Sequence, residues 1–79
     1  MDNKQKIKNF IIESSYSDPE KIKDETLIFK EGFFDSMGFV NLLGFLEENF
    51  NIKMDDKDLV EENFESINSI SKFVTLKSN

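Results

Sequence analysis

The 79-residue chain has ten lysines, no arginine and sixteen acids, so its net charge is −6, and its 38% of hydrophobic residues suffice for one small core. Because it contains neither cysteine nor histidine, it lacks a disulfide framework, a thiolate nucleophile, the commonest metal ligand and the usual general base near neutral pH. An acidic chain without arginine is also a poor nucleic-acid binder, and no apolar run approaches the roughly 20 residues of a membrane span.

The first helix is predicted over residues 2–15, where apolar residues recur at helical spacing and Asp2 or Asn3 can act as the N-cap. The N-terminus lacks the apolar core of a signal peptide, which favours a cytoplasmic protein. The turn residues before Pro19 end the helix, because the residue that precedes a proline avoids the helical conformation.

A long connection follows over residues 17–35. Connections of this length in a small domain are usually functional or held against the core, and six apolar side chains favour the second alternative. We expect one short turn after Pro19 and a sharp bend at Gly32. The apolar residues of this connection are Ile22, Leu27, Ile28, Phe29, Phe33 and Phe34.

The second helix is predicted over residues 36–50, with Asp35 and Ser36 as candidate N-caps and Asn51 as its terminator. Four apolar residues at helical spacing are expected to face the core, and three others widen the apolar surface beyond one stripe. Helices that are apolar nearly all round are either deeply buried or part of an interface. The expected core face consists of Val40, Leu43, Leu46 and Phe50, and the additional residues are Phe39, Leu42 and Phe45.

The last third of the chain predicts a short helix followed by a longer one. Residues 55–60 can form one or two turns, a brief helix is expected near residues 61–65, and Ser66 is a natural N-cap for the final helix. No hairpin signal occurs, so the predicted fold is all-α: a small four-helix bundle that forms one domain over residues 1–79. The expected core face of the final helix consists of Ile67, Ile70, Phe73 and Val74.

The acidic residues are concentrated in one part of the chain. Residues 31–66 hold ten acids and two lysines, and they form either an ordinary solvated face or a docking surface for basic partners. They do not match a calcium loop, because the sixth position from Asp56 is Glu61 instead of glycine and the twelfth is Ile67 instead of glutamate. We therefore expect no dedicated metal site.

An enzyme is also not expected. A serine nucleophile needs an activating base, the chain has no histidine, and it has no glycine-rich phosphate loop. A helical bundle of 79 residues offers little room for a substrate cleft.

Asp35, Ser36 and Met37 join a glycine-bearing loop to the start of the most apolar helix. Taken alone, Asp35 or Ser36 is a helix cap. A phosphate ester built on the Ser36 hydroxyl would also be stabilised there, by the free N–H groups and the positive end of the helix.

The surrounding sequence closely resembles the acyl carrier proteins, and the resemblance covers essentially the whole chain. Residues 29–40 contain the Asp-Ser-Met form of the attachment motif of this family. Residues 42–52 resemble the second helix of the family, with its Leu-Glu-Glu-x-Phe ending, and residues 62–73 resemble the third and fourth helices. The resemblance implies a four-helix carrier with a long first loop and a short third helix.

The same resemblance implies roles for individual residues. A phosphopantetheinyl transferase would esterify 4′-phosphopantetheine to Ser36, and Asp35 would help to present the magnesium-bound cofactor. Met37 would flank the arm. The residues implied in partner docking are Phe39, Val40, Glu47 and Glu48.

Three positions differ from the pattern of fatty-acid carriers. Gly38 and Asn41 stand where acids are usual, and Gly44 stands where a larger apolar residue is usual. Close helix packing is one explanation for a glycine in the middle of a helix. Phe39 and Phe45 either pack under the first loop or contact an apolar partner. The chain is in these respects more similar to carriers that work with adenylate-forming ligases, including D-alanyl and freestanding peptidyl-type carriers.

The resemblance therefore implies a non-catalytic, monomeric carrier that holds acyl or aminoacyl groups as thioesters. Its partners would be the transferase, an activating ligase and downstream acyl-transfer enzymes of fatty-acid (lipid), polyketide or peptide-type biosynthesis. A growing acyl chain would be sheltered in the core beside the second helix. The alternative is a small helical adaptor that binds its partners without being modified.

Overall fold

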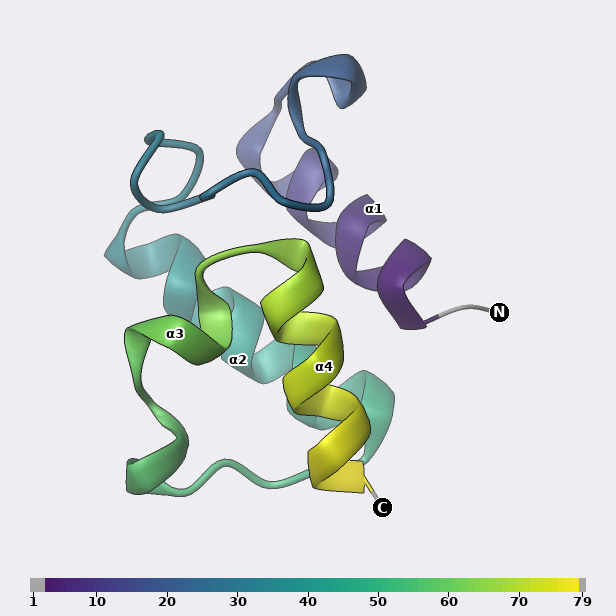
Figure 1. The fold of residues 1–79 in the computed structure, drawn as a ribbon, viewed down its shortest axis with the longest axis vertical. Coiled ribbons are helices and arrows are strands. Elements are labelled where there is room, and N and C mark those ends of the chain that lie inside the picture. The colour runs from purple at the N-terminus through teal and green to yellow at the C-terminus, as the bar shows by residue number, and fades with distance from the viewer. Residues whose placement is uncertain (1–2, 79) are drawn as a thin grey trace.

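Four α-helices and two single turns of 3-10 helix make up the computed structural model, which describes residues 3–78. No strand occurs in that range, so the all-α prediction is confirmed, as are the long first connection and the short third helix. No helix within it is long and apolar enough to cross a membrane. In chain order the elements are α1 (Asn3–Ser15), η1 (Pro19–Lys21), α2 (Ser36–Phe50), η2 (Asp56–Asp58), α3 (Glu61–Phe64) and α4 (Ile67–Ser78) (Figure 1).

The core lies where α1, α2 and α4 meet, and α3 packs against α4 (Figure 1). Each long helix contributes apolar residues three or four positions apart, which is the spacing that places side chains on one helix face. Burying these side chains is the main favourable contribution to folding. The fully buried residues of the three helices are Ile7, Ile11, Leu42, Leu46, Ile67, Ile70 and Val74.

The connection between α1 and α2 is held against the rest of the protein, as its apolar residues predict. Ile22, Ile28 and Phe34 are buried in the core. The Ile28 N–H donates to the Glu65 carbonyl at 3.0 Å, which attaches the connection to the junction of α3 and α4. The turn after Pro19 is present as η1, and Gly32 bends the chain with a φ of +85°, a conformation that favours glycine.

The orientation of α2 differs from the prediction. Leu42 and Leu46 are fully buried, whereas Val40, predicted to face the core, is 59% exposed. Because α2 is apolar nearly all round, its sequence does not determine which of two neighbouring apolar stripes faces the core. The packing of the docked loop against the helix helps to determine it. Rings from that loop and from α3 cover the side of α2 that carries Phe39, because the Phe39 ring packs edge-on against Phe29 and Phe64.

The helix ends follow the predicted chemistry with one correction. The N-cap of α2 is Asp35, and Ser36 is its first helical residue. Asn51 ends α2 in the left-handed conformation with a φ of 53°, and Ser66 Oγ accepts the Ser69 N–H at 3.1 Å as the N-cap of α4. Of the two candidate caps of α1, Asp2 lies outside the described residues and Asn3 is the first residue of the helix.

Candidate functional site

Two neighbouring residues at the start of α2 have different tasks. The Asp35 carboxylate accepts the Gly38 N–H at 2.9 Å, and the Asp35 carbonyl accepts the Phe39 N–H at 3.0 Å. Ser36 is exposed, and within residues 3–78 its hydroxyl makes no hydrogen bond. Since the aspartate supplies the cap, the serine hydroxyl stays available for chemistry.

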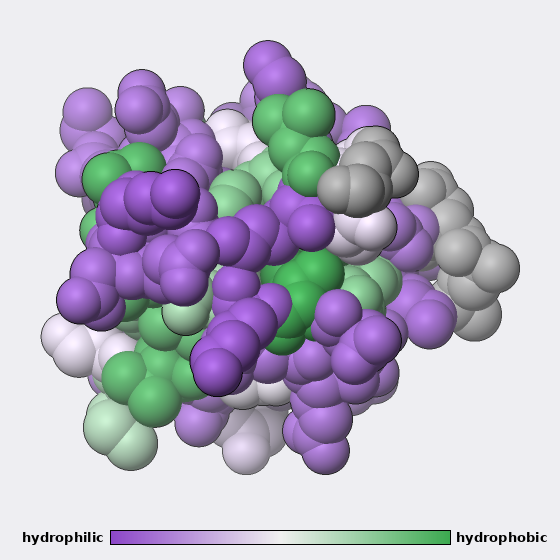
Figure 2. Space-filling view, turned by 90° about the horizontal axis from the view of Figure 1, so that it is seen from below, coloured by the Kyte–Doolittle hydropathy of each residue, from purple (hydrophilic) through white to green (hydrophobic). Residues whose placement is uncertain are grey.

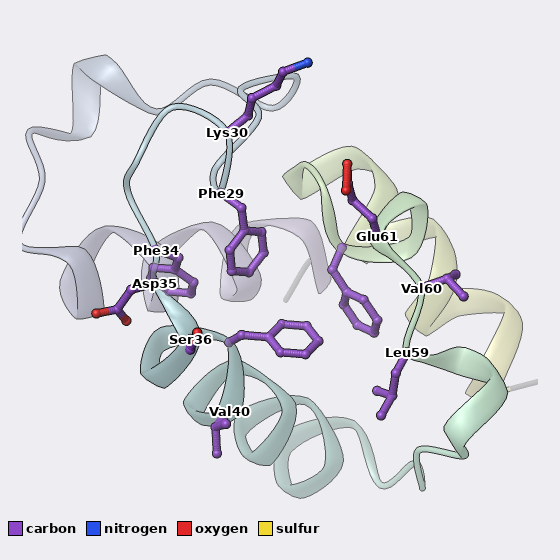
Figure 3. A pocket seen from close by; sticks show the side chains of 11 residues that line it. Phe29, Lys30, Phe34, Asp35, Ser36, Val40, Leu59, Val60 and Glu61 are labelled. Carbon is purple, nitrogen blue, oxygen red and sulfur yellow. The ribbon is translucent and has the colours of Figure 1, made fainter.

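A groove of about 800 Å³ lies beside Ser36. Figure 3 shows Ser36 and Val40, both on α2, on one side of it and Leu59 and Val60 on the other. Lys30 also lines the groove and is the only cation among its lining residues. The walls are therefore largely apolar, with charged groups confined to a few positions.

Phenylalanine rings close the inner end of the groove. The Phe39 ring lies 5.6 Å from Phe29 and 5.3 Å from Phe64, measured between centroids, and Phe64 lies 5.2 Å from Phe73 in the core. All three pairs are edge-to-face, an arrangement that favours aromatic contact. The groove is thus an open trench on the surface, and these aromatic rings form its floor.

Apolar side chains are exposed on both sides of the trench. Val40, on α2, is 59% exposed, and Leu59 and Val60, in the segment before α3, are each 41% exposed on the other side of the trench. Isolated exposed apolar residues are ordinary on protein surfaces, whereas this group of them borders one trench. Met37, in the first turn of α2, is 67% exposed but does not line the trench.

Two glutamates that the sequence treats as a pair differ in the structure. The Glu47 carboxylate accepts the Met54 N–H at 2.8 Å and so holds the segment after α2. Glu48 is exposed and has no hydrogen bond or ion pair within the described part of the chain. Only Glu48 is therefore free to meet a partner without cost to the fold.

An ion-pair cluster holds the far wall of the trench, and sequence reasoning missed it. Lys77 Nζ lies 2.6 Å from Asp58 Oδ2 and 3.1 Å from Asp55 Oδ2. The hydrogen bond from Lys77 lowers the pKa of Asp58, and the bonds to Asp58 and Asp55 raise the pKa of Lys77. No local pattern links residues 19 and 22 positions apart, so only the fold shows this contact. Across residues 3–78, no three acids come close enough together to hold a metal ion.

Comparison with known proteins agrees with this geometry. A family model described as the phosphopantetheine attachment site matches residues 5–74. The chain therefore belongs to the phosphopantetheine-bearing carrier proteins, the family whose cofactor, 4′-phosphopantetheine, is attached covalently.

Two curated relatives extend the comparison. The D-alanyl carrier protein of Streptococcus suis (strain 05ZYH33) is 39% identical over 70 residues, which cover 89% of this chain and 87% of the relative. The acyl carrier protein of Bdellovibrio bacteriovorus (strain ATCC 15356 / DSM 50701 / NCIMB 9529 / HD100) is 28% identical over 72 residues, which cover 91% and 90%. The chain is a carrier protein of this family, and the acyl-carrier resemblance of its sequence is confirmed.

Proposed function

We propose that Ser36 is the attachment residue and that the protein carries an activated amino acid between enzymes. The free hydroxyl of Ser36, at the start of α2 and beside an apolar trench, is the observation that carries the assignment. When bound, the phosphopantetheine arm supplies a terminal thiol that holds the cargo as a thioester.

The residues around Ser36 fit the phosphate end of this group. Asp35 occupies the Gly38 N–H, while the N–H groups of Ser36 and Met37 have no acceptor within residues 3–78. These two donors and the positive end of α2 favour a negative charge next to the serine. Lys30 also lines the trench, but its side chain points away from Ser36 (Figure 3).

The trench fits the rest of the arm. Its volume of about 800 Å³ lies in the range of small-molecule sites, and its walls are largely apolar. Val40 and Leu59 on its two sides would give an arm lying between them apolar contacts. The chain needs no base of its own, because the transferase that modifies Ser36 provides the catalysis.

The aromatic floor supports a small cargo. A long acyl chain gains most from a deep apolar cavity, whereas the packed rings of Phe29, Phe39 and Phe64 form the floor of this open trench. The relative named as a D-alanyl carrier is more similar to this chain than the one named as an acyl carrier. Both observations favour an aminoacyl group loaded by an adenylate-forming ligase over a fatty acyl chain.

Partner enzymes are proposed to dock on the exposed side of α2, where Met37 and Val40 lie near Ser36 and Glu48 lies near the C-terminal end of the helix. Glu47 contributes charge to the same surface while it holds the Met54 N–H. Phe39 is half-buried against Phe29 and Phe64, so we assign its ring to the trench and not to docking.

The test is the intact mass of the protein before and after incubation with coenzyme A, magnesium and a broad-specificity phosphopantetheinyl transferase. We expect one phosphopantetheine adduct on the wild type and none on Ser36→Ala. Loading of the modified protein with radiolabelled amino acids by an adenylate-forming ligase then tests the cargo. If the wild type gains no adduct while another carrier in the same reaction does, the carrier function is refuted and the unmodified adaptor takes its place.

A further inference from the structure

The charged residues that line the trench differ in how the fold uses them. They are Lys30, Asp35 and Glu61. The Asp35 carboxylate is occupied, because it accepts the Gly38 N–H at 2.9 Å. The Glu61 carboxylate makes no hydrogen bond and no ion pair within residues 3–78, and Lys30 does not pair with it. Glu61 therefore places a negative charge in the trench that the fold does not use.

Glu61 marks the polar end of the trench. In Figure 3, Glu61 on α3 and Lys30 on the first connection lie at the upper end, and Val40 and Leu59 lie at the lower end. A molecule lying along the trench would thus meet apolar side chains at one end and charged groups at the other. The two charges have opposite signs and belong to opposite sides, so a cation would be attracted to the side of α3 and repelled by Lys30.

The backbone that carries Glu61 is held in place from both directions. Phe64, three residues further on, is 1% exposed, and its ring packs edge-on against Phe73 of α4. Before α3, Asp58 pairs with Lys77 at 2.6 Å. A carboxylate on a supported element can bind a group at a defined position in the trench.

The cargo of the proposed function carries a group that suits this charge. An amino acid held as a thioester has used its carboxyl group in that bond, and its α-ammonium remains as a positive charge. A fatty acyl group has no cation to offer. An ammonium and a carboxylate form a charge-assisted hydrogen bond, so a carboxylate in the trench distinguishes these two classes of cargo.

We propose that Glu61 selects the cargo by pairing its carboxylate with the α-ammonium of the aminoacyl group attached through Ser36, an inference that rests on the proposed function. Ser36 and Glu61 line the same trench, so the tethered ammonium reaches the carboxylate within one molecule. Tethering gives an effective concentration in the millimolar range, at which a pair that is weak between free molecules still forms.

Glu62 provides a matched control. Glu61 and Glu62 are both exposed and both lie in the first turn of α3, so an effect of charge on the helix itself would apply to either. Glu62 does not line the trench. A pair with the cargo therefore requires Glu61 only, and replacing either glutamate by glutamine removes the same charge with little change in shape.

The test measures the pKa of the cargo ammonium directly. The transferase is supplied with a coenzyme A analogue in which nitrogen replaces the terminal sulfur and which carries ¹³C-labelled alanine as a stable amide. Intact mass verifies the adduct, and the ¹³C signal of the alanine methyl group is followed by NMR across the pH range. We expect the ammonium pKa to be lower by roughly 0.2–0.7 units in Glu61→Gln than in the wild type, and unchanged in Glu62→Gln. The difference should shrink in about 1 M salt, which screens exposed charges.

Equal pKa values in Glu61→Gln and the wild type, or equal decreases in the two variants, would overturn the pairing and leave the proposed function intact. An isobutyryl group, in which a methyl group replaces the ammonium of alanine, is the matched cargo. We expect the backbone signals of Leu59, Val60 and Glu61 in the ¹⁵N-labelled wild type to differ between the alanyl and isobutyryl forms. Identical signals would also refute the pairing. If the wild type gains no adduct while another carrier does, the proposed function and this inference fail together.

Discussion

Asp35 and Ser36 show how a helix start can serve the fold and the chemistry through adjacent residues. The aspartate oxygen accepts one of the free N–H groups in the first turn of α2, that of Gly38, and the serine hydroxyl is not used by the fold within residues 3–78. A cap residue is worth about 1 kcal/mol, so the fold depends measurably on the aspartate and hardly on the serine. Substitutions at position 35 can therefore separate capping from any role of its charge.

We expect Asp35→Ala to lower the free energy of unfolding by about 1 kcal/mol, because the Gly38 N–H loses its acceptor. Asp35→Asn keeps an oxygen acceptor and should unfold like the wild type. Urea unfolding followed by circular dichroism measures both. If Asp35→Asn keeps its fold but is modified more slowly by the transferase, the negative charge of Asp35 acts in presenting the cofactor. Equal stability of the alanine and asparagine variants would contradict the capping role.

The two glutamates near the end of α2 should respond differently to the same change. Glu47→Ala removes the acceptor of the Met54 N–H and is expected to cost at most about 1 kcal/mol, since the bond is exposed. Glu48→Ala should leave stability unchanged, because Glu48 has no partner in the described part of the chain. Thermal unfolding of the two variants side by side distinguishes them. Glu48 is therefore the residue to substitute in a partner-docking assay, because its charge can be altered without disturbing the loop after α2.

At the scale of the helix, α2 contains two glycines with opposite requirements. The explanation of Gly44 by close helix packing is wrong, because a Cβ atom there would meet no atom within 4 Å. We expect Gly44→Ala to raise the free energy of unfolding by about 0.5–1 kcal/mol, because alanine favours the helix and its Cβ atom meets nothing. Gly38→Ala should destabilise the protein, since its Cβ atom would lie 2.9 Å from the Phe34 ring, close to the start of that side chain. Denaturant unfolding of both variants is the measurement. A destabilising Gly44→Ala would mean that the glycine does serve the fold.

Local sequence chemistry predicts the elements of this protein well. Caps, a proline and a glycine mark the ends of the helices, and α2 extends over the predicted range from Ser36 to Phe50. Which side of α2 is buried does not follow from its own sequence, because apolar residues surround the helix. Val40 is exposed and Leu42 buried because α1, α4 and the docked loop cover one particular side of α2, and the loop contributes the edge-on contact between Phe29 and Phe39.

The candidate site, too, is predicted from the sequence only in part. The position of Ser36 at the start of a helix is readable from the motif, but the trench beside it is assembled from two separate stretches of the chain, residues 29–40 and 59–64. Leu59 and Val60 have no signal of their own as walls of a site. The different tasks of Glu47 and Glu48 depend on a backbone N–H seven residues away.

Over the whole molecule, hydrophobic side chains reach the surface in separate patches among hydrophilic ones (Figure 2). The acids of residues 31–66 give this surface its negative charge, and the lysines lie mostly outside that range. A basic partner would thus be attracted at long range, whereas the trench would supply close contacts. Lys77 is an exception, because it pairs with Asp55 and Asp58 and so joins α4 to the segment that forms the trench wall.

The Lys77 cluster should make stability depend on pH in a defined way. The pKa of Asp58 is lowered in the folded protein, so its contribution is present above the unfolded value near 3.8 and is lost as the pH falls through the folded pKa. The pKa of Lys77 is raised, so its contribution is present below the unfolded value near 10.5 and is lost as the pH rises through the folded pKa.

Between these limits, Lys77→Met should be less stable than the wild type, while Lys77→Arg should keep most of the stability of the wild type. Free energies of unfolding measured across the pH range test this, because the gap between wild type and Lys77→Met should close at the acidic end. A gap that is independent of pH would assign the effect of Lys77 to the packing of its stem and not to its charge, and the trench wall would then be held by apolar contact alone.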